Sequence, residues 1–237
     1  MRVLEWGPRD SGARAFRRPD GQGHLHLPEQ TAGWAALLAA RPAELVDVVL
    51  TADEGRSCTD LERLGFVATR IEQLWRVPVS GLARGISTGR HDLREVTACD
   101  LDRVTALDNA VRAQIPGSEG WQGTVSDLQE SLEDDEFDPQ LYLVAVRHDT
   151  GDYDGLVRVW WRRPDPRLGC VGVRPSWRRT RLGPALLAAV AGTLQQRGVT
   201  YVVTETDVHN RDSQCMAARH EAIPVGRTVE WVLRPAS

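Results

Sequence analysis

A short segment, residues 178–183, carries the side chains best suited to chemistry in this sequence. It follows an apolar run that ends at Val173 and precedes a long apolar run over 183–196, which predicts a strand, a loop and a helix. The unpaired N–H groups of a first helical turn and the helix dipole attract anions. Positive charge and a hydroxyl are added by Arg178, Arg179, Arg181 and Thr180. The segment therefore predicts a site for a pyrophosphate or a similar dianion.

Acid–base chemistry has two candidate carboxylates, Glu205 and Asp207. Because they are two residues apart, their side chains share one face of a predicted strand. If that face lines a cleft, one of them can remove a proton from an ammonium group. The alternative is that both are solvated acids at a strand end. His209 and His220 are further candidates for proton transfer, because histidine is a residue type suited to that role, with a surface position as the alternative. Cys215 is a candidate nucleophile, with an inert helix position as the alternative.

The composition excludes several classes of function. All 29 basic residues are arginine, so chemistry that needs a Walker lysine or a Schiff-base lysine is excluded. The net charge of −4 gives no support to nucleic-acid binding, and no run of about 18 apolar residues exists to span a membrane. No spacing of His, Cys and Asp predicts a metal site. The four cysteines lie far apart and residues 1–16 lack the apolar core of a signal peptide, so we expect a cytoplasmic protein.

Apolar periodicity places the Arg-rich segment in an alternation of helices and strands. Helices are predicted over 31–40, 60–64, 101–111, 125–132, 183–196 and 212–219. Strands are predicted over 45–53, 71–79, 93–97, 141–146, 155–161, 168–173, 200–207 and 228–235. This alternation is typical of an α/β (α+β) protein.

The Arg-rich segment resembles the acetyl-CoA loop of the GCN5-related N-acetyltransferase (GNAT) superfamily. That loop reads Arg/Gln-x-x-Gly-x-Gly/Ala after a Val-x-Pro strand exit, and here Val-Arg-Pro at 173–175 precedes Arg-Arg-Thr-Arg-Leu-Gly at 178–183. The chain departs from the pattern at Arg181, which replaces the first Gly, and at Pro184, which removes a backbone N–H. The order of predicted elements from Leu93 to Arg234 is also the order of the family.

The resemblance implies a GNAT fold, with a mixed central sheet flanked by helices, and acetyl-CoA or another acyl-CoA as the cofactor. Two strands would splay apart in that fold, and backbone groups of Val171 and Val173 would bond the pantetheine arm. The remaining cofactor-binding residues implied by the resemblance are Arg178, Arg179, Thr180, Arg181, Leu182, Gly183, Asn210 and Ser213. The family often places a Tyr that protonates the thiolate at the position of Ala217, so this general acid is missing.

The first 80 residues resemble the second half of a GNAT domain and contain no Arg-x-x-Gly loop. We expect three parts: a degenerate half-GNAT-like domain over 1–80, a linker over 81–90 and a complete GNAT domain over 91–237. The alternative for 1–80 is an unrelated α/β extension.

The region between the first two helices of a GNAT fold commonly forms the acceptor side of the cleft. Trp121 and Glu136 are therefore the candidate acceptor-binding residues, with a solvated loop as the alternative for the acidic run 133–138. The sequence predicts an N-acyltransferase that moves an acyl group from acyl-CoA to a small-molecule amine, as a monomer or homodimer with no nucleic-acid or membrane partner. The alternatives are a non-catalytic GNAT-like sensor or scaffold, and a GNAT fold used for other CoA-thioester chemistry.

Overall fold

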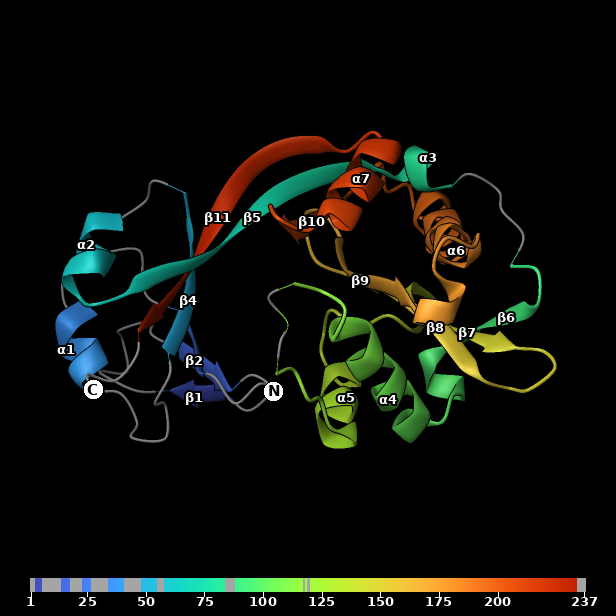
Figure 1. Cartoon of the computed structure of the whole chain (residues 1–237), viewed down its shortest axis with the longest axis horizontal. Helices are drawn as coiled ribbons and strands as arrows, with labels where there is room; N and C mark the ends of the chain where they lie inside the picture. The colour runs from blue at the N-terminus through green and yellow to red at the C-terminus, as the bar shows by residue number, and fades with distance from the viewer. Residues whose placement is uncertain are drawn as a thin grey trace. The chain divides into compact units, whose positions relative to one another are not determined.

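The computed structural model describes residues 3–5, 14–17, 23–26, 34–40, 48–54, 58–83, 88–116, 118 and 120–233 (Figure 1). The chain divides into two compact units. Unit 1 consists of Met1–Gln73 and Gly226–Ser237, and unit 2 consists of Leu74–Val225. Two long strands, β5 (Val67–Pro78) and β11 (Ile223–Leu233), contribute residues to both units. No helix among the described residues combines the length and apolarity needed to cross a bilayer.

Unit 2 contains a mixed sheet with the strand order β5-β10-β9-β8-β7-β6. Its further strands are β6 (His91–Glu95), β7 (Tyr142–Arg147), β8 (Tyr153–Trp160), β9 (Arg167–Val173) and β10 (Tyr201–Asp207). Neighbours from β6 to β9 are antiparallel, whereas β9 and β10 are parallel. The helices are α3 (Val79–Leu82), α4 (Leu101–Arg112), α5 (Val125–Leu132), α6 (Leu182–Gln196) and α7 (Arg211–Arg219). Short 3-10 turns are η1 (Val96–Ala98), η2 (Pro139–Leu141) and η3 (Pro175–Trp177).

Helices cover both faces of this sheet (Figure 1). On one side, which we call the α6 face, Leu186 and Val190 pack against alternate strand residues such as Val157. On the other side, the α4 face, α4 and α5 pack against the intervening residues, among them Val144 and Leu156. Successive strand side chains point to opposite faces, which explains why the apolar runs of β7 and β8 serve two cores.

Local sequence fixes where the helices of unit 2 begin. The Asp100 side chain accepts a hydrogen bond from the backbone N–H of Arg103 and caps α4. Thr124 and Asp127 form a capping box at the start of α5, in which each side chain bonds the other residue's backbone N–H. The entrance of α6 differs, because its N-cap residue, Arg181, makes no side-chain cap.

Unit 1 has the strand order β1-β2-β3-β4-β11-β5. Its first strands are β1 (Val3–Glu5), β2 (Arg14–Arg17), β3 (Gly23–His26) and β4 (Val48–Asp53), and its helices are α1 (Trp34–Ala39) and α2 (Cys58–Arg63). Strand β4 lies parallel to β3 and antiparallel to β11. The buried side chains Trp34, Leu61, Phe66 and Trp231 belong to its core.

The predicted mixed sheet flanked by helices is confirmed in unit 2. Within the expected linker over 81–90, Gly81 and Leu82 end helix α3 and are buried. The last part of β11 belongs to unit 1, where residues 228–233 pair with β4. Parts of the expected linker (84–87), of the helix over 31–40, of the strands over 45–53 and 228–235, and residues 117 and 119 lie outside the described residues.

Candidate active site

Strands β9 and β10 part soon after they meet. They pair at Arg167 and Val203, where the Val203 N–H donates to the Pro166 carbonyl at 2.9 Å. The Thr204 hydroxyl donates to the Leu168 carbonyl at 2.9 Å. Beyond this point no register joins the rest of β9 to β10 in the described chain.

The separated part of β9 presents backbone groups at an open edge. The Arg174 N–H donates to the Asp154 carbonyl, so Arg174 and alternate residues before it face β8. By the same alternation, the N–H and C=O groups of Val171 and Val173 point away from β8 to the edge without a strand partner. An extended amide-containing ligand can pair with this edge as an added strand.

The open edge leads into a loop rich in positive charge. After η3, the side chains of Arg178, Arg179 and Arg181 are exposed, and none has a carboxylate partner in the described part of the chain. Arg179 has φ 61°, a left-handed conformation that costs energy for a residue with a side chain. The Thr180 hydroxyl donates to the Trp177 carbonyl and accepts from the Leu182 N–H, so both groups are used within the loop.

The start of α6 has room and free donors for phosphate oxygens. A Cβ built on Gly183 would meet no atom within 4 Å. The backbone N–H groups of Arg181 and Gly183 form no hydrogen bond within the described residues, and Pro184 has no N–H. These donors, the helix dipole and the three arginines fit a pyrophosphate.

A network of hydrogen-bonded side chains packs against η3, at the start of the Arg-rich loop. Trp177, in η3, packs edge-on against the His91 ring at 4.5 Å between ring centroids. His91 and Arg147 both bond the Asp154 carboxylate, at 3.0 Å and 2.7 Å, and the Arg147 guanidinium lies 5.3 Å from the Trp177 ring centroid. Burial raises the pKa of Asp154, but the hydrogen bonds from Arg147 and His91 outweigh it, so this pKa lies below its ordinary value. The start of the loop therefore packs against charged side chains whose hydrogen bonds are satisfied.

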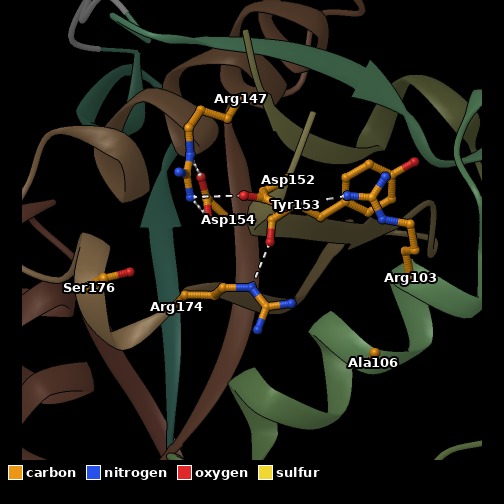
Figure 2. Close-up of a pocket in the computed structure, with 8 residues that line it drawn as sticks. All are labelled: Arg103, Ala106, Arg147, Asp152, Tyr153, Asp154, Arg174 and Ser176. Atoms are coloured by element: carbon orange, nitrogen blue, oxygen red, sulfur yellow. Dashed lines mark hydrogen bonds and ion pairs between the residues drawn. The ribbon is translucent and has the colours of Figure 1, made fainter. Parts of the chain in front are cut away.

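A hollow of about 350 Å³ opens beside the start of the loop (Figure 2). Its lining residues are Arg103, Ala106, Arg147, Asp152, Tyr153, Asp154, Arg174 and Ser176. Each of its guanidinium groups is bonded within the protein: Arg147 to Asp154, Arg174 to the Tyr153 carbonyl, and Arg103 to the Gly151 carbonyl. The bond to the Tyr153 carbonyl holds Arg174, which connects β9 to the loop.

The two predicted acid–base residues lie on the α4 face of β10. Val202 belongs to the α6-face core, so Glu205 and Asp207, which alternate with it, point to the opposite side. The Arg167 Nε donates to both oxygens of Glu205, at 3.1 Å and 2.8 Å. The Asp207 side chain accepts from the His209 N–H at the following turn.

The residues predicted near the cofactor arm lie at the start of α7. Asn210 is the N-cap of this helix, and its side-chain oxygen accepts from the Ser213 N–H at 3.1 Å. Ala217 is buried, and Cys215 is exposed. The His220 Nδ1 lies 2.9 Å from the Gly81 carbonyl.

The two predicted acceptor-binding residues, Trp121 and Glu136, interact with different parts of the protein. Trp121 is held over α4, because the Asn109 side chain bonds both the N–H and the C=O of Gly123 at 2.9 Å. The Arg112 guanidinium stacks 4.2 Å from the Trp121 ring centroid. Glu136 instead forms an ion pair with Arg162 at 3.0 Å.

Sequence reasoning missed a row of residues on the α4 face. Tyr142, Arg158 and Cys170 lie opposite one another across β7, β8 and β9. Burial raises the pKa of the Tyr142 hydroxyl and that of the Cys170 thiol, so both stay protonated near neutral pH. The available signal was Arg158 itself, a charged residue inside the apolar run 155–161.

The comparisons with known proteins agree with this geometry. The model of the acetyltransferase (GNAT) family matches residues 109–221, from the end of α4 to the turn after α7. Residues 109–221 are therefore similar to the domain of GNAT acetyltransferases. The domain includes the divergent β9 and β10, the Arg-rich loop and α6.

Relatives extend the likeness beyond this domain. A mycothiol acetyltransferase of Pseudarthrobacter chlorophenolicus is 32% identical over 168 residues, which are 62% of this chain and 48% of the relative. The chain thus spans about half the length of that relative. A GCN5-related N-acetyltransferase from Sphaerobacter thermophilus has a TM-score of 0.67 at 20% identity, covering 95% of this chain and 77% of that one. A tandem GNAT protein from the clavulanic acid biosynthesis pathway has a TM-score of 0.68 at 16% identity, covering 95% and 79%. The predicted GNAT fold is confirmed.

Proposed function

We propose that this protein is an acyl-CoA-dependent N-acyltransferase that uses acetyl-CoA and acylates the amine of a small molecule. The observation that carries the proposal is the open edge of β9 at Val171 and Val173, which runs directly into the loop of three arginines that have no carboxylate partner in the described part of the chain. The open edge can pair with the amides of pantetheine. The start of α6 can bind the pyrophosphate of the same CoA molecule.

The chain's own residues would hold the cofactor at both ends. Val171 and Val173 offer backbone groups to the pantetheine amides, and Arg181 and Gly183 offer free N–H groups to the pyrophosphate. Arg178 and Arg179 add full charges, while Thr180 and Leu182 act by shaping the loop. Asn210 and Ser213 lie at the start of α7, where the Asn210 amide nitrogen remains available to the cofactor arm. When bound, acetyl-CoA supplies an activated acyl group as a thioester.

Glu205 is the proposed base, directly or through water, with Asp207 as the second carboxylate on the same face. The Arg167 guanidinium orients the Glu205 side chain beside the point where β9 and β10 part. The Val171 N–H, at the open edge, can stabilise negative charge on an acyl oxygen. Trp121 and Glu136 remain the proposed acceptor contacts, on the side of α4 and α5.

A non-catalytic CoA-binding protein is the second candidate. It is favoured by Ala217, which is buried and offers no proton for a departing thiolate. This candidate predicts CoA binding without thiol release from any amine.

Calorimetric titration with acetyl-CoA, followed by thiol detection with a panel of amines, tests both candidates. We expect saturable binding, and thiol release that depends on an amine. Arg178→Ala should weaken binding by roughly 1–3 kcal/mol, as for a charge-assisted contact. Arg94→Ala, an exposed arginine on β6, is the matched control and should bind as tightly as the parent. No binding at millimolar acetyl-CoA would exclude both candidates.

We also propose that residues 1–80 are a degenerate half-GNAT-like domain before a complete domain over 91–237. The likeness to the tandem GNAT protein supports this organisation, because it covers 95% of the chain.

A further inference from the structure

Arg158 is an unusual arginine within unit 2. Its guanidinium stacks on the rings of Tyr142 and Trp160, at 5.4 Å and 4.9 Å, and its Nε is buried without a hydrogen-bond partner. No carboxylate of the described residues pairs with it. Several other arginines of the unit do have such partners: Arg112 with Asp108, Arg147 with Asp154, Arg162 with Glu136, and Arg167 with Glu205. A half-buried guanidinium without an anion is suited to receive one from a ligand.

Three other buried polar atoms, on α4, on the segment stacked against it and on β7, also have no hydrogen-bond partner among the described residues. They are the Tyr142 hydroxyl, the Asp108 Oδ1 and the Trp121 Nε1. Tyr142 is 1% exposed, so its hydroxyl has been removed from water without compensation. Tyr142 lies opposite Arg158 in the strand register, and Asp108 belongs to α4, the helix that packs on the same face as Tyr142 and Cys170. Unsatisfied polar groups gathered in one place require an explanation, and a polar ligand provides one.

This group of residues lies beside the open edge of β9. Arg158 is directly opposite Cys170, the residue before Val171. Helix α4 sits tightly on the same strand, because a Cβ on Gly172 would come within 2.2 Å of Val111 Cγ1. Since neighbouring strands are about 4.8 Å apart, Arg158 lies within roughly two strand spacings of the edge.

We propose that the acceptor is an amine that also carries a carboxylate, as an amino acid does. Arg158 binds the carboxylate, and the Asp108 Oδ1 accepts a hydrogen bond from the ammonium group before it is deprotonated. The local pairing agrees, because Asp108 already forms an ion pair with Arg112, which leaves the Arg158 guanidinium for the carboxylate of a ligand. The Tyr142 hydroxyl and the Trp121 indole N–H supply further hydrogen bonds that fix the orientation. This inference rests on the proposed acyltransferase function and narrows its substrate.

The test compares L-alanine, L-serine and L-phenylalanine with their amides, which keep the amine and lose the negative charge. With acetyl-CoA, we expect kcat/KM for an acid to exceed that for its amide at least tenfold. Arg158→Gln should lower kcat/KM for the acids at least tenfold, mainly through KM, and leave the amides nearly unchanged. Arg158→Lys, which keeps the charge but loses the planar fork, should be intermediate. Arg94→Gln is the control, since Arg94 is exposed on β6 and pairs only weakly with Asp92.

Equal use of acids and amides by the parent protein would overturn the inference, as would an equal loss for both in Arg158→Gln. Acetyl-CoA titration of each variant separates this from a failure of the proposed function. If acetyl-CoA binds and no amine is acylated, the proposed transferase activity is wrong. Calorimetric binding of L-serine against L-serine amide, in the presence of CoA, then still decides whether Arg158 receives a carboxylate.

Discussion

The two faces of the unit 2 sheet bury polar groups in different ways. Beside the α6 face, Asp154 is 1% exposed and receives hydrogen bonds from His91 and Arg147, so that the buried charge is compensated. On the α4 face, the Tyr142 hydroxyl and the Arg158 Nε are buried and have no hydrogen-bond partner among the described residues. An unpaired buried polar group costs free energy, whereas a paired one is close to neutral.

This difference suggests a division of roles within one sheet, in which the α6 face stabilises the fold and the α4 face binds a ligand. The α6 face carries an apolar helix and a closed polar network, which together fix the strand and the loop that follow. The α4 face keeps unsatisfied donors and acceptors close to the open edge of β9. A surface that gives up stability in this way is typical of a binding site.

Leu186→Ala should have the largest effect on the α6 face. Leu186 is fully buried in α6, so its truncation should lower the free energy of unfolding by about 4 kcal/mol. Gln195→Ala, at an exposed position of the same helix, should change it by less than about 0.5 kcal/mol. Chemical denaturation measures both. A changed preference between acid and amide acceptors in Leu186→Ala would show that the α6 face also takes part in recognition.

Asp154→Asn tests whether the hydrogen bonds from His91 and Arg147 to Asp154 stabilise the folded protein. Removing the charge leaves Arg147 and His91 without their anion and should cost about 3 kcal/mol at pH 7. Because the pKa of Asp154 is lowered in the folded protein, its stabilisation is present above the unfolded pKa of about 3.9 and is lost as pH falls through the folded value. The difference between parent and variant should therefore shrink in acid. Denaturation at pH 7 and near pH 3 measures it, with exposed Asp135→Asn as the control.

Apolar periodicity predicted most elements of unit 2 because their patterns are long and local. The helix predicted over 183–196 is α6 (Leu182–Gln196), and the helix over 125–132 is α5. Short strands escaped prediction: β1 and β2 have three and four residues, which is too few for an alternating pattern to be recognised. Helix α3 was also missed, because Pro78 and Gly81 are typical of a loop and only burial against the core explains the turn.

The sequence predicts those parts of the candidate site that are formed by consecutive residues. It does not predict the parts that come from separate strands. The Arg-rich loop is six consecutive residues, and a strand-loop-helix pattern identifies it. The row of Tyr142, Arg158 and Cys170 comes from three strands, and only their register brings it together. The ion pair between Glu205 and Arg167 depends likewise on the pairing of β9 with β10.

Gly172→Ala and Gly192→Ala sharpen the comparison because they should have opposite signs. A methyl group at Gly172 would clash with Val111 and push α4 away from β9, at a cost of about 2 kcal/mol. A methyl group at Gly192, within α6, would meet nothing within 4 Å and should stabilise the helix by about 0.5–1 kcal/mol. Thermal unfolding gives both signs, and a neutral Gly172→Ala would mean that α4 does not sit firmly on β9.

Tyr142→Phe should have the smallest effect on stability, and this small effect tests directly whether the Tyr142 hydroxyl has a partner in the folded protein. Its hydroxyl has no protein partner, so removing it should leave the free energy of unfolding unchanged or raise it by up to about 1 kcal/mol. Tyr153→Phe is the matched control, because the Tyr153 hydroxyl accepts from the Asp100 N–H at 3.0 Å. Its loss should cost about 1 kcal/mol. Denaturation curves of the two variants provide the comparison.

Acceptor kinetics complete the argument about Tyr142. If the α4 face keeps its polar groups for a ligand, Tyr142→Phe should raise the acceptor KM several-fold while the protein stays as stable as its parent. Tyr153→Phe should do the reverse, losing stability with little change in KM. A destabilised Tyr142→Phe with an unchanged KM would instead mean that the hydroxyl has a structural partner. The contrast between the two faces would then no longer hold at this residue.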